Sequence, residues 1–132
     1  RTARTEVLFG PPGMAYVYLC YGIHEMLNVV TEQDGFPAAI LVRAVECRGM
    51  LIDGPGRLTR AFSIDRRLNR CDVTTGEALW FEDRGEVLSQ GTLKTYLRIG
   101  VDYAGEWAKK PWRFRWEADA GPGQRKRQRS MR

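Results

Sequence analysis

The sequence predicts a mixed α/β fold of the α+β kind. Residues 14–20 (MAYVYLC) and 26–31 (MLNVVT) have strand composition, and Tyr21-Gly22 between them indicates a β-hairpin. Residues 38–46 (AAILVRAVE) are nearly continuous Ala, Ile, Leu and Val, which is typical of a central strand. A helix is expected after these strands, so the chain combines both kinds of element.

The helix is predicted over residues 57–64, because Gly54-Pro55-Gly56 precedes it and proline suits the first turn. Its first N–H groups could receive a phosphate. The remaining segments are assigned by composition and by their Gly and Pro residues. They are a basic lead-in at 1–6, a rigid turn at 9–13, a loop at 32–37, a basic loop at 66–70, short strands at 78–82 and 97–103, a helical turn at 105–109 and a last strand at 112–117.

The length of 132 residues, with 43% hydrophobic residues, fits one domain with its own core. We place this domain at residues 1–117. Residues 118–132 are rich in Gly, Gln, Arg and Lys and are expected to form a basic disordered tail. No apolar run approaches the ~18 residues that a membrane helix needs, so no membrane partner is expected.

The three cysteines, Cys20, Cys47 and Cys71, lie far apart and show no CxxC spacing. A zinc site or a disulfide framework is therefore not expected. Free thiols fit a reducing compartment, which predicts a location in the cytoplasm or nucleoid, or in the nucleus of a eukaryote.

The formal net charge is +5, and most of the cations are arginines. Guanidinium groups suit two-pronged contacts with phosphate, so the charge favours a nucleic-acid partner. The alternative is a basic surface that has no such partner.

Aromatic and polar residues of the hairpin are the main candidates for binding. Tyr16 and Tyr18 share one face of their strand, where they form either a stacking wall or part of the core. Tyr21 stands at the tip, which has no core to join. Asn28 lies on an otherwise apolar strand, where an amide is uncommon unless it is bonded or reads a ligand.

Two charged or titratable residues stand out. Arg43 interrupts an apolar strand, where a charge is costly unless it is paired or faces a functional cleft. His24, the only histidine, is either an acid–base group or ligand, or more commonly a surface or packing residue.

Several segments, in the same order, closely resemble the alkyladenine (3-methyladenine) DNA glycosylase family, and the resemblance covers most of residues 1–116. They are 10–18 (GPPGMAYVY), 21–22 (YG), 27–30 (LNVV), 39–46 (AILVRAVE), 53–59 (DGPGRLT) and 98–113 (RIGVDYAGEWAKKPWR).

The resemblance implies a single domain around a curved antiparallel sheet, with a protruding β-hairpin that inserts into the DNA minor groove. It implies a monofunctional hydrolase of N-glycosyl bonds in base-excision repair, without lyase activity, cofactor or metal. Nothing in the sequence demands more than a monomer, which is the state we expect. Its partner would be double-stranded DNA that contains alkylated purines such as 3-methyladenine or 7-methylguanine. A flipped base and an activated water would react in the pocket.

The resemblance also assigns roles to contacts with the duplex. Tyr21 would fill the gap that the flipped nucleotide leaves, and Ile23 and His24 would press on the neighbouring bases. Thr2 and Arg4 would lie along the DNA backbone. A wedge of this kind stabilises a distorted duplex from its minor groove.

In the base pocket, the resemblance implies that Tyr18 stacks on the extruded base; Tyr16, on the same face of the strand, is a further candidate for this contact. Asn28 would crowd the exocyclic 2-amino group of guanine. Arg43 would hold the attacking water together with the backbone near Ile99. Alkylated purines carry positive charge, so an aromatic wall attracts them by cation–π interaction, worth about 0.5–2 kcal/mol.

The general-base glutamate of the family, and a pocket tyrosine and histidine after it, precede the position of Arg1, and Glu6 does not take the catalytic place. We therefore expect a longer parent protein and a chain that is catalytically silent alone. Residues 47–53 look shorter than the family pattern. The alternative is a non-catalytic DNA-binding remnant that recognises damaged or bent duplex; a basic RNA-associated domain is a third interpretation.

Overall fold

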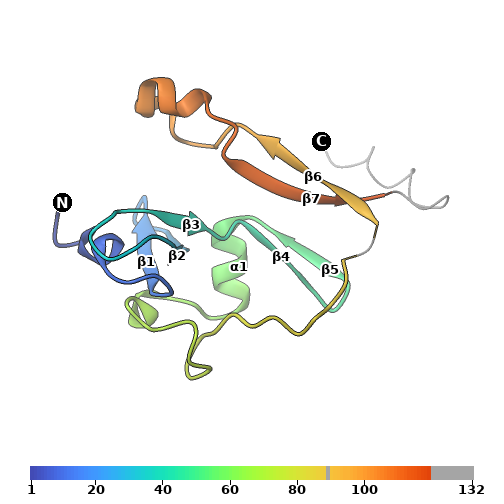
Figure 1. The fold of residues 1–132 in the computed structure, drawn as a ribbon, viewed down its shortest axis with the longest axis horizontal. Coiled ribbons are helices and arrows are strands. Elements are labelled where there is room, and N and C mark those ends of the chain that lie inside the picture. The colour runs from blue at the N-terminus through green and yellow to red at the C-terminus, as the bar shows by residue number, and fades with distance from the viewer. Residues whose placement is uncertain (89, 120–132) are drawn as a thin grey trace. The chain divides into compact units, whose positions relative to one another are not determined.

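The computed structural model describes residues 1–88 and 90–119. The chain groups into two compact units, Arg1–Asp83 and Arg84–Arg132, and each is described by itself. Both contain antiparallel strands and helical segments (Figure 1), which confirms the mixed α/β class. The single domain over 1–117 stays a prediction, and most of the expected tail lies outside the described residues.

The first unit is built on a three-stranded antiparallel sheet in the order β1-β2-β3. Its strands are β1 (Ala15–Cys20), β2 (His24–Val30) and β3 (Ala39–Leu41). The hairpin of β1 and β2 is confirmed, with Tyr16 opposite Asn28 and Cys20 opposite His24. β2 is therefore the central strand, and it begins two residues earlier than predicted.

The predicted central strand over 38–46 is wrong, because it is broken at Arg43. Val42 N–H still bonds to Leu27 O at 3.0 Å, but Arg43 O accepts from Gly54 N–H at 2.9 Å. The chain thus changes its pairing partner at this residue. The following strand, β4 (Ala44–Cys47), pairs with β5 (Met50–Asp53) in a separate two-stranded sheet.

The helix after Gly54 is confirmed as α1 (Pro55–Ala61), with Pro55 in its first turn and Gly54 before it at φ 123°. Two 3-10 turns were not predicted. η1 (Glu6–Phe9) lies in the expected lead-in and turn, and η2 (Arg66–Leu68) replaces the expected basic loop. The Asp65 carboxylate accepts from Arg67 N–H at 2.9 Å, which satisfies a donor at the start of η2.

The core of the first unit lies on both faces of the sheet because side chains alternate along each strand. Ala15, Val17 and Leu27 pack on one face, together with Ile64 and Val73. On the other face a smaller cluster holds Tyr16, Val30 and Val7. η1 therefore covers the tyrosine face.

The predicted strand over 78–82 is wrong; this stretch has no regular secondary structure. It is held by single contacts, since Phe81 N–H bonds to Val73 O at 2.8 Å and Leu79 packs against the core. One bond of this kind ties the segment down without extending a sheet.

The second unit holds a two-stranded sheet of β6 (Gly91–Tyr96) and β7 (Arg113–Ala118), and η3 (Asp102–Lys109) between them. The last strand is confirmed, and it extends to Ala118. The strand expected over 97–103 is wrong, because β6 ends at Tyr96. η3 extends beyond the expected turn over 105–109 and is kinked at Gly105 (φ 57°).

No helix within the described part of the chain is both long and apolar enough to cross a membrane.

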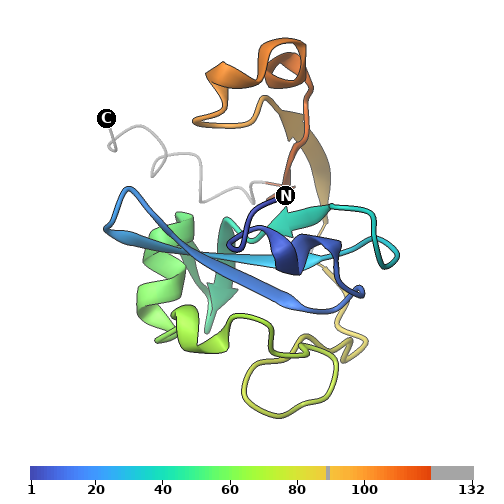
Figure 2. The same ribbon diagram turned by 90° about the vertical axis from the view of Figure 1, so that its left-hand side faces the viewer.

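The hairpin is fixed to α1 by a close approach at Gly56. A Cβ at this position would lie 2.9 Å from His24 Nδ1, 3.1 Å from Cγ and 3.2 Å from Cβ. Figure 2 shows α1 along the end of the hairpin that carries its turn. A glycine at this position is therefore required by packing rather than by its φ.

We predict that Gly56→Ala destabilises the full-length protein by about 1–3 kcal/mol, the usual cost of overpacking. Within a helix, replacing Gly by Ala ordinarily stabilises the protein by ~0.5–1 kcal/mol. At Gly56 we expect the same replacement to destabilise it instead. Urea unfolding measures the change. In a His24→Ala background the same substitution should lose most of its cost, and equal destabilisation in both backgrounds would contradict the packing argument.

Candidate nucleic-acid interface

The hairpin turn presents two exposed apolar residues. Tyr21 (φ 50°) and Gly22 (φ 67°) both have positive φ, and Ile23 N–H bonds to Cys20 O at 3.1 Å. Because Cys20 pairs with His24, three residues form the loop, and the positive φ values let the chain reverse within it. The Tyr21 side chain is 89% exposed and Ile23 is exposed as well, so both reach outward from the tip.

The base of this turn is held by α1 and η2. Thr59 Oγ1 donates to Glu25 O at 2.9 Å and to Gly56 O at 3.1 Å. Arg66 Nε donates to Glu25 Oε1 at 3.1 Å. Together with the His24 ring against Gly56, these contacts fix the strand that follows the tip. The roles of Thr59 and Gly56 were not predicted from the sequence, because the helix was expected to begin only after Gly56, whereas α1 includes it.

The tyrosine face of the hairpin forms a stacked pair. The Tyr16 and Tyr18 ring centroids lie 5.1 Å apart with an interplanar angle of 30°. Tyr16 is only 6% exposed and belongs to the small core cluster, whereas Tyr18 is half-buried. Tyr16 is therefore part of the core, and Tyr18 lies at its margin; stacking of either ring on a base stays a prediction.

Asn28 is buried on the same face, directly across from Tyr16. Its Nδ2 donates to Tyr16 O at 3.2 Å and to Met26 O at 3.4 Å. These bonds satisfy the buried amide. A role in recognising a base stays a prediction.

Thr2 and Arg4 lie in a turn before η1. Thr2 N–H donates to Thr5 Oγ1 at 2.9 Å, and Thr5 N–H donates to Thr2 Oγ1 at 3.3 Å. Arg4 is exposed, and its Cζ lies over the Tyr18 ring, 5.6 Å from the centroid. The structure thus brings Arg4 to the tyrosine pair; contact of Arg4 and Thr2 with DNA stays a prediction.

Arg43 is half-buried and lies between β3 and β4. Ile99 belongs to the second unit, where it is exposed between β6 and η3. Their joint role in holding a water is therefore not tested and stays a prediction.

The segment around Ile99 is held by two arginines. Arg98 Nη2 donates to Trp107 O at 2.9 Å, and its Cζ lies 5.4 Å from the centroid of the Trp112 ring. Arg113 Nε donates to Leu97 O at 2.9 Å. The Trp107 and Trp112 rings are 5.6 Å apart, so cations and indoles together close this loop.

A cavity of about 460 Å³ is lined by Glu25, Asp65, Arg66 and Arg67. Its charges are paired, since Arg66 bonds Glu25 and Arg67 Nη2 lies 2.7 Å from Asp65 Oδ2. Hydrogen bonds from the side chain and backbone of Arg67 lower the pKa of Asp65 to about 2. A carboxylate so stabilised is a weak base, and sequence analysis did not predict this cluster.

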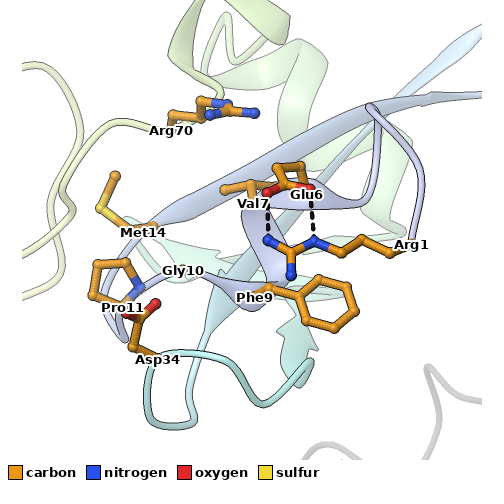
Figure 3. A pocket seen from close by; sticks show the side chains of 9 residues that line it. All are labelled: Arg1, Glu6, Val7, Phe9, Gly10, Pro11, Met14, Asp34 and Arg70. Atoms are coloured by element: carbon orange, nitrogen blue, oxygen red, sulfur yellow. Dashed lines mark hydrogen bonds and ion pairs between the residues drawn. The ribbon is translucent and has the colours of Figure 1, made fainter.

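A second cavity, of about 240 Å³, lies beside η1 (Figure 3). Arg1 donates from Nε to Glu6 Oε2 at 2.8 Å and from Nη2 to Oε1 at 2.5 Å. Its guanidinium also lies 4.6 Å from the Phe9 ring centroid. The bond to Arg1 lowers the pKa of Glu6, so this carboxylate is poorly suited to act as a general base.

Within residues 1–88 and 90–119 no group of three or more His, Cys, Asp or Glu side chains is placed to hold a metal ion. Each of the three cysteines carries a free thiol.

Three curated proteins similar to this chain are each named "Putative 3-methyladenine DNA glycosylase". The protein from Methanocella arvoryzae is 46% identical over 129 residues, which cover 86% of this chain and 63% of that protein. The protein from Myxococcus xanthus is 44% identical over 137 residues, with 95% and 69% covered. For Anaeromyxobacter dehalogenans the values are 46% over 116 residues, with 86% and 55% covered.

These alignments span between 55% and 69% of the length of the three relatives. The model of the methylpurine-DNA glycosylase (MPG) family matches residues 1–120. The resemblance found in the sequence is thereby confirmed, and the chain belongs to the methylpurine-DNA glycosylase family.

Proposed function

We propose that the protein carrying this chain removes alkylated purines, such as 3-methyladenine and 7-methylguanine, from double-stranded DNA by hydrolysing the N-glycosidic bond. Family membership supports the reaction class. The single observation in the structure that supports it most is Tyr21, 89% exposed on a tight turn. The proposal concerns the full-length protein, because the chain spans only part of its relatives.

The first step is extrusion of the base from the duplex, which costs roughly a few kcal/mol. Tyr21 compensates by stacking in the vacated space, and such stacking is worth about 1–3 kcal/mol per base. Ile23 and His24 flank the wedge on the neighbouring base pairs. The contacts of β2 with α1 limit how far the turn can give way when the duplex presses on it.

In the pocket, Tyr18 stacks on the extruded purine and Asn28 crowds the 2-amino group of guanine. N-alkylation places positive charge on the purine, which makes it a better leaving group. The enzyme then needs a positioned water, held by Arg43, and a general base. Water as the nucleophile makes the protein a monofunctional glycosylase, without lyase activity.

The carboxylate nearest the start of the chain does not supply that base in this proposal. Glu6 is bonded twice to Arg1 and its pKa is lowered. The same observation favours a second candidate function, a non-catalytic protein that binds damaged or bent duplex with the same wedge. The two candidates differ only in whether the protein releases a base. For both, we propose a location in the cytoplasm or nucleoid, where the DNA is.

The full-length protein should release 3-methyladenine or 7-methylguanine from methylated duplex DNA. Chromatography of the released bases measures this. Unmethylated duplex is the control and should release none. Tight binding of methylated duplex without release would favour the second candidate, and neither binding nor release would refute both.

Tyr21→Ala should weaken binding to lesion-containing duplex about 10- to 100-fold, which corresponds to the loss of one stacking contact. Tyr21→Phe should retain most of the affinity, because the ring remains. Thermal unfolding should change little, since the side chain is exposed. Phe36→Ala, which removes another exposed aromatic ring, is the matched control; an equal loss there would refute a specific wedge.

Arg43→Ala should slow base excision at saturating enzyme by about tenfold or more, since a water-positioning contact acts on the chemical step. Lesion binding should remain within a few fold. Single-turnover kinetics and a gel-shift titration separate the two effects. Loss of binding with an unchanged rate would assign Arg43 to the fold or to DNA contact instead.

A further inference from the structure

The Tyr18 ring is already in contact with a cation. Arg4 Cζ lies over this ring, 5.6 Å from its centroid, while Tyr16 stacks with the same ring at 5.1 Å. An aromatic ring has two faces, and Tyr16 takes one of them. A guanidinium over the ring therefore competes with any other group that is to stack on Tyr18.

The position of Arg4 follows from the turn that carries it. The bonds between Thr2 and Thr5 close this turn, and the ion pair of Arg1 with Glu6 fixes its two ends. Arg4 itself is exposed. Its guanidinium is thus directed to the ring by the backbone, while the side chain can leave without disturbing the core.

An N-alkylated purine and a guanidinium share the chemistry that a tyrosine ring recognises. Both are planar, delocalised cations, and both are attracted by the negative face of the ring. They cannot stack on one face together, and their like charges repel at contact distance.

We propose that Arg4 occupies, in the DNA-free protein, the face of Tyr18 that receives the cationic purine, so that entry of the base must displace Arg4. This inference rests on the proposed function, because it takes Tyr18 as the stacking surface for the base. Arg4 thereby acts as an internal competitor that lowers the affinity of the pocket for cationic purines in solution. Once displaced by a flipped base, its guanidinium is released next to the polyanionic backbone of the same duplex.

The proposal gives Arg4→Ala two effects of opposite sign in the full-length protein. Binding of 7-methylguanosine, a soluble N-alkylated purine, should become about two- to fivefold tighter, because one exposed cation–π contact no longer has to be broken. Binding of lesion-containing duplex should become weaker and less salt-dependent, because a phosphate partner is lost. Calorimetry at fixed salt measures the first, and titration across salt concentrations the second.

Arg60→Ala is the matched control, because it removes the same charge from an exposed position on α1. It should leave 7-methylguanosine binding unchanged. In a Tyr18→Leu background, Arg4→Ala should no longer tighten the nucleoside, since the shared ring is gone.

Unchanged or weaker nucleoside binding in Arg4→Ala would overturn the inference, as would an equal gain in Arg60→Ala or in the Tyr18→Leu background. Absence of nucleoside binding in every variant would overturn it too. Base release from methylated duplex is measured independently, so the inference can fail while the proposed glycosylase stands.

Discussion

The pairing register of β1 with β2 is the constraint on which the candidate interface depends. Because side chains alternate, the pairing of Tyr16 with Asn28 puts the tyrosines and the amide on one face and Val17 and Leu27 on the other. A slip by one residue would exchange the two faces. The apolar contacts of Leu27 with the segment after α1 therefore also determine where Tyr18 lies, although they touch no ligand.

The tip of this hairpin combines exposure with restraint. An exposed phenol ring at positive φ is an uncommon choice for a turn residue and contributes little to the core. The strain of the positive φ at Tyr21 is tolerated because the strand after the turn is held in place. Hydrogen bonds to Glu25 and the His24 ring against Gly56 hold it. Under the proposed function, a free hairpin would bend away on contact with a stacked duplex, whereas one held from the side keeps Tyr21 directed at the bases.

Local signals were enough for the sequence to predict the β1–β2 hairpin, α1 and the last strand. Each is specified by residues a few positions apart, such as Tyr21-Gly22 or Gly54-Pro55. The break at Arg43 was not predictable, because it depends on a bond to Gly54, eleven residues along the chain. β6 was not predicted, because Leu93 is its only aliphatic side chain and gives no alternating apolar pattern. Its partner β7 also lies far along the chain. Residue patterns singled out Tyr21, Asn28 and Arg43 as candidates, whereas Thr2, Arg4, Ile23 and Ile99 were named from the family resemblance alone.

The net charge of +5 does not by itself show which surface would bind DNA, because some of the cations are paired with carboxylates. Arg1, Arg66 and Arg67 each pair with a carboxylate within the first unit, so their fields are locally neutralised and reach a phosphate only weakly. Arg57 and Arg60 are exposed on α1, and this helix begins against His24, three residues after Tyr21. Under the proposed function, Arg57 lies at the same end as Tyr21 and is placed to bind the backbone of the duplex. Placement of these charges, rather than their sum, therefore makes the tip region the best candidate surface for DNA.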